Sequence, residues 1–274
     1  MILSTPLTVC LVVLGRYMPQ LSFLHILLGD EPVLATEAQI YQRLLAMDQD
    51  EAQTIVDQFL KGKPLVELYD EVLIPALTMA EQDRHKGAID ATREEFLFLS
   101  LNDIIAELSE YQPAAPSPEL SEDPSAEKEA AGQIIEAAHS RGRILCLPAH
   151  DRADEITGAM LAQLLEQKGL AVISFPLGGA TPDEWVRLLD VTENDVVCIS
   201  SLPPYAFAPA RSLCKQIRER FPKLKVVVCI WGFSGDRQRA MSRFERTPPD
   251  RLASSLAGVI ADIEELVAAP SATR

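Results

Sequence analysis

Hydrophobic residues are spaced in three different ways along the chain. Residues 1–15 form an apolar run without a charged side chain. From residue 20 to residue 110, apolar residues recur at every third or fourth position, which is typical of amphipathic helices. Helices are therefore expected at Ala38–Met47, Glu51–Leu60, Pro64–Gly87 and Ala91–Leu108. This spacing predicts a bundle of four or five helices over residues 20–110.

Two prolines predict where one helix of the bundle begins and where it is disturbed, and apolar spacing predicts which face of the last helix is buried. Pro64 is expected at the first helical position, where its missing N–H is not needed. Pro75 should kink or restart the same helix, because a proline inside a helix removes a hydrogen bond. The last helix is expected to bury Phe96, Leu99, Ile104, Ile105 and Leu108.

The apolar pattern stops between residues 111 and 129. Four prolines interrupt a run that is rich in Ser, Ala and Glu: Pro113, Pro116, Pro118 and Pro124. Such a segment has too little apolar surface to form a core, so its composition predicts a stiff, solvated acidic linker. The domain boundary is placed in this segment.

Short apolar runs alternate with helical stretches over residues 130–268. The runs predict buried strands at Arg143–Pro148, Leu170–Phe175, Asp195–Ser200 and Lys225–Ile230. Helices are expected at Ala153–Lys168, Thr181–Leu189, Pro209–Arg220 and Ser255–Ala268. Arg251–Ser254 is either a short fifth strand or the approach to the last helix. The predicted fold class is a helical bundle followed by a doubly wound, mostly parallel α/β sheet, with residues 269–274 as a tail.

Composition narrows the class of partner. The 274 residues carry 40 acidic and 25 basic side chains, a formal net charge of −15. A phosphate backbone is captured by clustered Lys and Arg, so this charge argues against nucleic acid as a direct partner. The five cysteines are an odd number without a C-x-x-C pair, and most lie in apolar runs. They are interpreted as reduced, buried thiols of a cytosolic protein.

The apolar start has two interpretations. A helix of fifteen residues is about 22 Å long, at about 1.5 Å per residue, which is short of a bilayer core of about 30 Å. The segment also lacks the basic start and the cleavage site of a secretory signal. It is therefore either a buried core helix or the last part of a transmembrane helix. Arg16, Tyr17 and Pro19 resemble an interfacial border, which favours a transmembrane stump over residues 1–19.

Loops at the carboxyl ends of the predicted strands are where a ligand would bind. They contain no nucleophile motif, no dinucleotide fingerprint and no metal-ligand spacing, so neither a catalytic residue nor a metal site is predicted. Turn geometry alone is an alternative explanation of Ser200, Gly178 and Gly179. The candidate ligand-binding residues are His150, Asp151, Glu155, Gly158, Gly178, Gly179, Ser200, Ser201 and Gly232.

The run from Ala149 to Gly178 (AHDRADEITGAMLAQLLEQKGLAVISFPLG), followed by VVCISSLPP and VVVCIWG, resembles a cobalamin-binding domain of the flavodoxin-like type. That family carries D-x-H-x-x-G after the first strand, S-x-L after the third and a glycine pair after the fourth. Alignment on Gly158 puts Ala153 at the aspartate and Glu155 at the cobalt-ligating histidine. Ser200-Ser201-Leu202 keeps the second pattern, and Trp231-Gly232 keeps one glycine. The bundle, notably LVELYDEVLIPAL, is similar to the cap domain that precedes such modules.

A second resemblance concerns the start of the chain. STPLTVCLVVLGRYMPQLSFLHILLGDEPVL, with IYQRLLAMDQDEA and LYDEVLIPAL, is similar to the junction in autoinducer-2 exporter-like permeases. In long members of that family, a cytosolic extension follows the final transmembrane helix. The resemblance implies that residues 1–19 contact a membrane or the membrane portion of a permease.

The leading hypothesis is a non-enzymatic regulatory or ligand-sensing region of such a permease, at the cytosolic face of the membrane. Its partners would be that membrane portion and a small-molecule ligand. The favoured expectation is no cofactor, with cobalamin as the alternative, because Glu155 replaces the histidine that would ligate cobalt. The alternative is a soluble, cytoplasmic sensor of the cobalamin-binding type, if Met1 is the true start. A group-transfer enzyme built on the same two domains, with a cofactor and a partner subunit, is a third class.

Overall fold

The computed structural model describes residues 34–111, 142–178, 182–244 and 247–268. The predicted membrane stump (1–19), the linker from residue 112 onward, the tail (269–274) and Gly179 lie outside the described residues.

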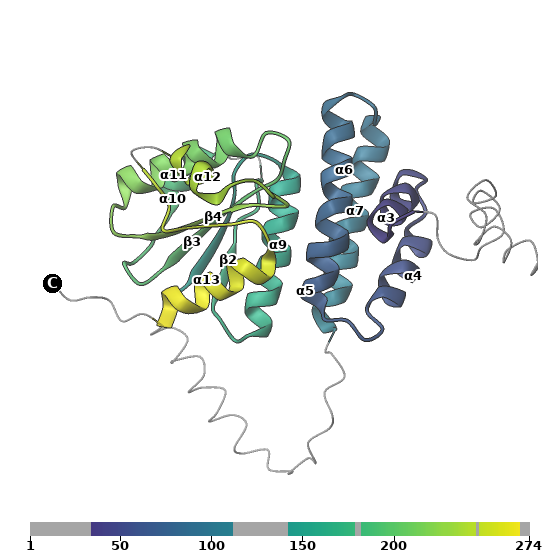
Figure 1. Cartoon of the computed structure of the whole chain (residues 1–274), viewed down its shortest axis with the longest axis horizontal. Coiled ribbons are helices and arrows are strands. Elements are labelled where there is room, and N and C mark those ends of the chain that lie inside the picture. The colour runs from purple at the N-terminus through teal and green to yellow at the C-terminus, as the bar shows by residue number, and fades with distance from the viewer. Residues whose placement is uncertain (1–33, 112–141, 179–181, 245–246, 269–274) are drawn as a thin grey trace, which may run out of the picture.

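The first described part is a bundle of helices (Figure 1). Asp48 and Asp90 begin two of the helices, since each carboxylate accepts a hydrogen bond from a backbone N–H of the first turn. The elements are α3 (Thr36–Leu45), α4 (Gln49–Phe59), α5 (Leu65–Leu68), η2 (Tyr69–Leu73), α6 (Ile74–His85), α7 (Ala91–Glu107) and η3 (Leu108–Glu110).

Pro75 neither ends nor sharply restarts its helix. The chain forms a π-helical turn over Tyr69–Leu73 directly before it, and the N–H of Ile74 donates to the carbonyl of Tyr69. Wider hydrogen bonding of this kind lets the helix continue past a residue that lacks an N–H. Pro64 is the residue before α5 and not its first helical residue, which corrects the predicted position by one.

The buried face of α7 differs from the predicted one. Ile104, Ile105 and Leu108 are buried as predicted, but Leu99 is 50% exposed. The helix instead buries Leu97, Phe98 and Leu101. The prediction was wrong for Leu99 because α7 contacts both the bundle and the sheet domain, which selects a different stripe.

The second part is a five-stranded parallel sheet in the order β2-β1-β3-β4-β5, which confirms the predicted fold class. Of the two alternatives for Arg251–Ser254, the structure has the strand, over Arg251–Ala253. Four of the strands have nearly continuous burial, as expected of strands covered on both faces, whereas β2 is partly exposed at the edge. The strands are β1 (Ile144–Pro148), β2 (Val172–Ser174), β3 (Val196–Ser201), β4 (Lys225–Ile230) and β5 (Arg251–Ala253).

Helices cover both faces of the sheet. The bundle side carries α9 (Arg152–Gln167) and α13 (Leu256–Ala268), whose side chains join one apolar core with the bundle. The opposite face carries α10 (Pro182–Leu188), α11 (Phe207–Arg220) and α12 (Arg237–Ser242) around a second core. Cys146, Cys198, Cys214 and Cys229 are buried in these cores and unbridged.

Polar contacts fix the bundle to the sheet domain within the apolar interface. The fully buried Tyr69 donates its hydroxyl to Gln163 of α9, which in turn donates to the carbonyl of Ile105 at 3.2 Å. Asp70 accepts hydrogen bonds from the N–H groups of Leu256 and Ala257, at 2.6 and 3.1 Å, and so caps α13 from the π-helical turn. The two parts therefore share a core and form one packed unit.

Candidate functional site

The direction of the sheet connections reverses between β1 and β3. These strands are neighbours, yet the chain leaves β1 for α9 on the bundle side and leaves β3 for α11 on the opposite face. The loops that follow them separate at the carboxyl edge of the sheet, and ligands of open α/β sheets bind at such a switch point. Residues 149–151 and 202–206 form these two loops.

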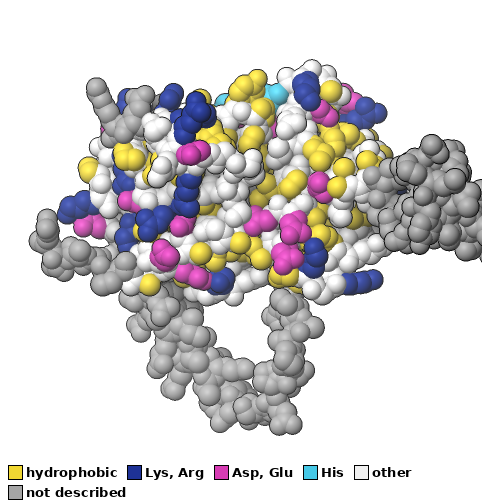
Figure 2. All heavy atoms as spheres, viewed as in Figure 1, with side chains coloured by type: hydrophobic (Ala, Val, Ile, Leu, Met, Phe, Trp, Pro, Cys, Tyr) yellow, Lys and Arg dark blue, Asp and Glu magenta, His cyan; other side chains and the backbone are white. Residues whose placement is uncertain are grey.

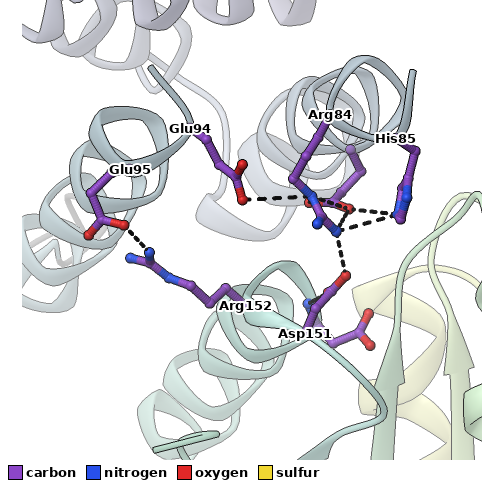
Figure 3. A network of polar contacts seen from close by, with 8 residues as sticks. Arg84, His85, Glu94, Glu95, Asp151 and Arg152 are labelled. Atoms are coloured by element: carbon purple, nitrogen blue, oxygen red, sulfur yellow. Dashed lines mark hydrogen bonds and ion pairs between the residues drawn. The ribbon is translucent and has the colours of Figure 1, made fainter. Parts of the chain in front are cut away.

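The end of α6 meets both loops. Arg84 Nη2 lies 2.7 Å from Asp151 Oδ2, in the loop after β1 (Figure 3). The ring of His85 contacts Tyr205, in the loop after β3, edge to face with centroids 4.9 Å apart. We call Arg84, His85, Asp151 and Tyr205 the interface site. It joins the helical bundle to the sheet at the switch point.

Arg84 is the electrostatic centre of this site. Its guanidinium also pairs with Glu81, at 2.6 Å from Nη2 to Oε2, and Glu94 Oε1 lies 4.0 Å from Nε. Burial raises the pKa of Glu81, and the hydrogen bond from Arg84 opposes that rise. Glu81 also lies 3.4 Å from His85 Nε2. Glu81, His85 and Asp151 could together offer three metal ligands, but the Arg84 guanidinium already supplies the positive charge between the two carboxylates.

A second ion pair crosses the same interface. Arg152, the first residue of α9, pairs with Glu95 of α7 (Figure 3). Asp151 also caps α9, because its Oδ1 accepts a hydrogen bond from the N–H of Asp154 at 3.3 Å. These ionic contacts thus hold the bundle directly against the start of α9.

Several predicted residues take roles inside the sheet domain. Glu155 Oε2 accepts a hydrogen bond from the N–H of Leu177 at 3.2 Å, so this carboxylate fastens the loop after β2. Gly178 and Gly232 have φ angles of +43° and +67°, a backbone region that favours glycine, which agrees with turn geometry. His150 is exposed beside Asp151, and Ser201 Oγ donates to the carbonyl of Ala206 at 2.9 Å.

Ser200 lies at the centre of a buried hydrogen-bond network. The indole N–H of Trp231 donates to Ser200 Oγ at 2.7 Å, and Ser200 Oγ lies 2.7 Å from Thr157 Oγ1. Thr157 donates its own hydroxyl to backbone carbonyls of α9, so the Ser200 hydroxyl donates to Thr157. A Cβ at Gly158 would lie 3.6 Å from Ser200 Cβ, which shows how closely α9 packs on β3 here.

Sequence reasoning missed Asp154. Its side chain is buried, and Oδ1 accepts a hydrogen bond from the N–H of Leu202 at 2.6 Å, which fastens the loop after β3 to α9. Burial is the main reason why the pKa of Asp154 lies well above the usual range of an aspartate. Arg84 and Tyr205 were also missed, since no local pattern shows that the end of α6 meets the sheet edge.

Comparison with known proteins points to one family for the bundle. Residues 36–96 match the B12 binding domain family. The resemblance of the bundle to a cobalamin-domain cap is thus confirmed over those residues. Among curated proteins, no sequence matches the chain.

The fold is similar to that of a solved corrinoid protein. A monomethylamine corrinoid protein of Methanosarcina barkeri superposes with a TM-score of 0.53 at 10% identity, covering 83% of this chain and 96% of that one. A cobalamin-binding protein of Desulfitobacterium hafniense gives 0.35 at 14% identity, with 85% and 99% covered. The methanol:cobalamin methyltransferase complex of M. barkeri gives 0.34 at 14% identity, with 88% and 82% covered.

These findings correct two expectations. The expectation of no cofactor is contradicted, because residues 36–96 match the B12 binding domain family and the fold is similar to that of a solved corrinoid protein. Nothing in the comparisons supports a permease or a membrane partner. Among the described residues, no helix has both the length and the apolar character needed to cross a bilayer.

The residues present fit a corrinoid only in part. The histidine-ligated mode does not fit, since Glu155 stands at the histidine position and its carboxylate bonds to Leu177. The interface site fits better. It has the exposed residues His85, His150 and Tyr205 at the switch point, and Tyr205 is 66% exposed. His85 Nε2 also lies 3.3 Å from Arg84 Nη2 and 3.4 Å from Glu81 Oε2. Imidazole nitrogen is a suitable ligand for a divalent transition metal, and an aromatic ring suits the face of a macrocycle.

Proposed function

We propose that this chain is a corrinoid-binding regulatory protein whose ligand binds at the interface site, between the end of α6 and the carboxyl edge of the sheet. One observation carries the proposal: the bundle that matches the B12 binding domain family meets the sheet at its switch point, through Arg84 to Asp151 and His85 to Tyr205.

The residues that would hold the corrinoid are those of the two facing surfaces. His85 and His150 supply imidazole nitrogen, and Tyr205 supplies an exposed ring. When bound, the corrinoid supplies a cobalt centre capable of ligand exchange. Glu155 has no part as a cobalt ligand, because its contact with Leu177 directs it toward the loop after β2.

The ion pairs across the interface support a regulatory role. Arg84 with Asp151, and Arg152 with Glu95, hold the bundle against the start of α9. A macrocycle that enters this interface must separate at least one pair. Binding would therefore change the position of the bundle, and a ligand that prefers the separated arrangement shifts the protein toward it. That the chain is not itself an enzyme remains a prediction.

The test is a binding titration of the full chain with aquocobalamin, followed by visible absorption and by colour retained through gel filtration. We expect one corrinoid per chain. His85→Ala and Tyr205→Ala should each weaken binding about tenfold or more, the scale of one lost close contact. Leu188→Ala is the matched control, because Leu188 is 71% exposed on α10, on the other face of the sheet.

Two results would overturn the proposal. One is a chain that retains no corrinoid. The other is equal affinity in all four proteins, which would place the ligand away from the interface site.

A further inference from the structure

Trp231 is the largest fully buried side chain among the described residues. It is the first residue after β4, and it lies on the sheet face that α9 and α13 cover. Its backbone N–H donates to the carbonyl of Ser201 at 3.1 Å, so the ring is fixed at the carboxyl edge. The indole thus lies buried between α9 and the strands, where Ser200 links it to Thr157 of α9.

Three positions of the cobalamin-domain pattern converge at this ring. Gly158 belongs to the pattern after the first strand, Ser200 begins the pattern after the third, and Trp231 stands at a glycine of the pair after the fourth. Ser200 contacts both of the others: 2.7 Å separates its Oγ from the indole nitrogen, and a Cβ at Gly158 would lie 3.6 Å from its Cβ. Where the pattern has small residues, this chain has a bicyclic side chain.

The size of the space decides which part of a corrinoid it could receive. A helix packed on a sheet leaves room for side chains only, so a broad corrin macrocycle cannot enter between α9 and β3. The nucleotide loop of cobalamin is slender and ends in a bicyclic aromatic base with ring nitrogens. Indole is also bicyclic and aromatic, and its ring nitrogen is hydrogen-bonded to the Ser200 hydroxyl.

We infer that Trp231 occupies the place of the cofactor's own base, so that this chain binds the corrin ring without inserting the nucleotide loop into the sheet domain. The inference rests on the proposed function. Its consequence is a ligand class: the chain accepts corrinoids with little regard to the nucleotide, including those that lack it.

The test compares cobalamin with cobinamide, a corrinoid without the nucleotide, by titration of the full chain. For the wild-type protein we expect affinities within about threefold of each other, because the corrin ring makes the contacts in both. Trp231→Ala should bind cobalamin about tenfold or more tightly relative to cobinamide, since the vacated space can then receive the base.

Two further variants keep the test decisive if Trp231→Ala does not fold. Trp231→Phe keeps an aromatic ring in the space but loses the N–H group, and it should retain the wild-type ratio of affinities. Trp185→Phe, on α10, is the matched control for the loss of a tryptophan. Thermal melting of each variant reports its folding.

The outcomes separate the two proposals. A wild-type protein that binds cobalamin about tenfold or more tightly than cobinamide would overturn the inference while leaving corrinoid binding intact. A folded Trp231→Ala variant with an unchanged ratio would also overturn it. A wild-type protein that binds neither corrinoid would overturn the proposed function itself.

Discussion

The buried carboxyl group of Asp154 holds the loop after β3, but its ionised form lowers the free energy of unfolding. It accepts the N–H of Leu202 and is buried near the start of α9. Burial penalises the ionised form and raises the pKa of Asp154 well above the usual range. The nearby charge of Asp151 acts in the same direction. The folded protein therefore binds this proton more tightly than the unfolded chain does.

The pH dependence follows from that difference. From about pH 4, the ordinary range of an aspartate, to the raised pKa, the unfolded chain binds fewer protons, so the free energy of unfolding falls as pH rises. We predict that Asp154→Asn, which keeps an acceptor for Leu202, flattens this fall and raises the melting temperature at neutral pH. Thermal melts across this pH range check it.

Asp154→Ala is the matched comparison for that prediction. It leaves the buried N–H of Leu202 without an acceptor and should lower the free energy of unfolding by about 1–3 kcal/mol near pH 4. The loss relative to the wild-type protein should become smaller as pH rises, because the alanine variant also lacks the titrating carboxyl group. A steeper pH dependence in Asp154→Asn than in the wild-type protein would contradict the explanation.

At the scale of elements, a side chain of the bundle caps the first turn of a helix in the sheet domain. Asp70 lies in the π-helical turn next to Pro75, and it accepts the first N–H groups of α13. The first N–H groups of a helix have no partner within the helix, so a carboxylate from outside can satisfy them. This side chain thus couples the bundle to the last helix of the sheet domain, next to the apolar core that they share.

We predict that Asp70→Ala lowers the free energy of unfolding by about 0.5–2 kcal/mol, the usual effect of losing a helix cap. The N–H groups of Leu256 and Ala257 should also exchange faster with deuterium. Asp90→Ala is the control, because Asp90 caps α7, the helix that directly follows it in the sequence, and does not link the two parts through that cap. It should destabilise the protein comparably without faster exchange at α13, and equal exchange in both variants would argue against the coupling.

At the scale of the whole molecule, charge is distributed rather than concentrated on the face seen in Figure 2, where acidic and basic side chains lie interspersed. The ion pairs that bear on the proposed function are those between the two parts. Asp151 and Arg84 each keep about a quarter of the side chain exposed, so their pair is partly screened by water. This ion pair can therefore separate at modest cost, while the apolar core that the two parts share stays in place.

We therefore predict that Asp151→Asn speeds association with aquocobalamin about two- to fivefold, the scale of one partly exposed ion pair. Asparagine still caps α9, so the helix start should be unaffected. Stopped-flow absorption measures the rate. Glu193→Gln is the matched control, because it also removes one negative charge but breaks a pair with Lys223 on another surface. An equal rate in both variants would show that net charge, and not this interface, controls entry.

The sequence by itself determined the two kinds of fold. Helical spacing indicated the bundle, and short apolar runs separated by helices indicated a parallel sheet, because the period of apolar residues is a property of the local chain. The sequence could not decide whether Arg251–Ala253 is a strand, because the segment has only three residues and is defined as a strand by its pairing with β4.

Tertiary structure decided the site. Gly158 and Ser200 were identified from a local pattern, but the role of Trp231 depends on three segments that meet from different strands and helices. Arg84 and Tyr205 are more than one hundred residues apart in the sequence numbering, and only the packing of α6 against the sheet edge brings them to one place. The spacing of apolar residues indicates which face of each helix or strand is apolar. Which of these faces pack against each other is decided by packing over the whole chain.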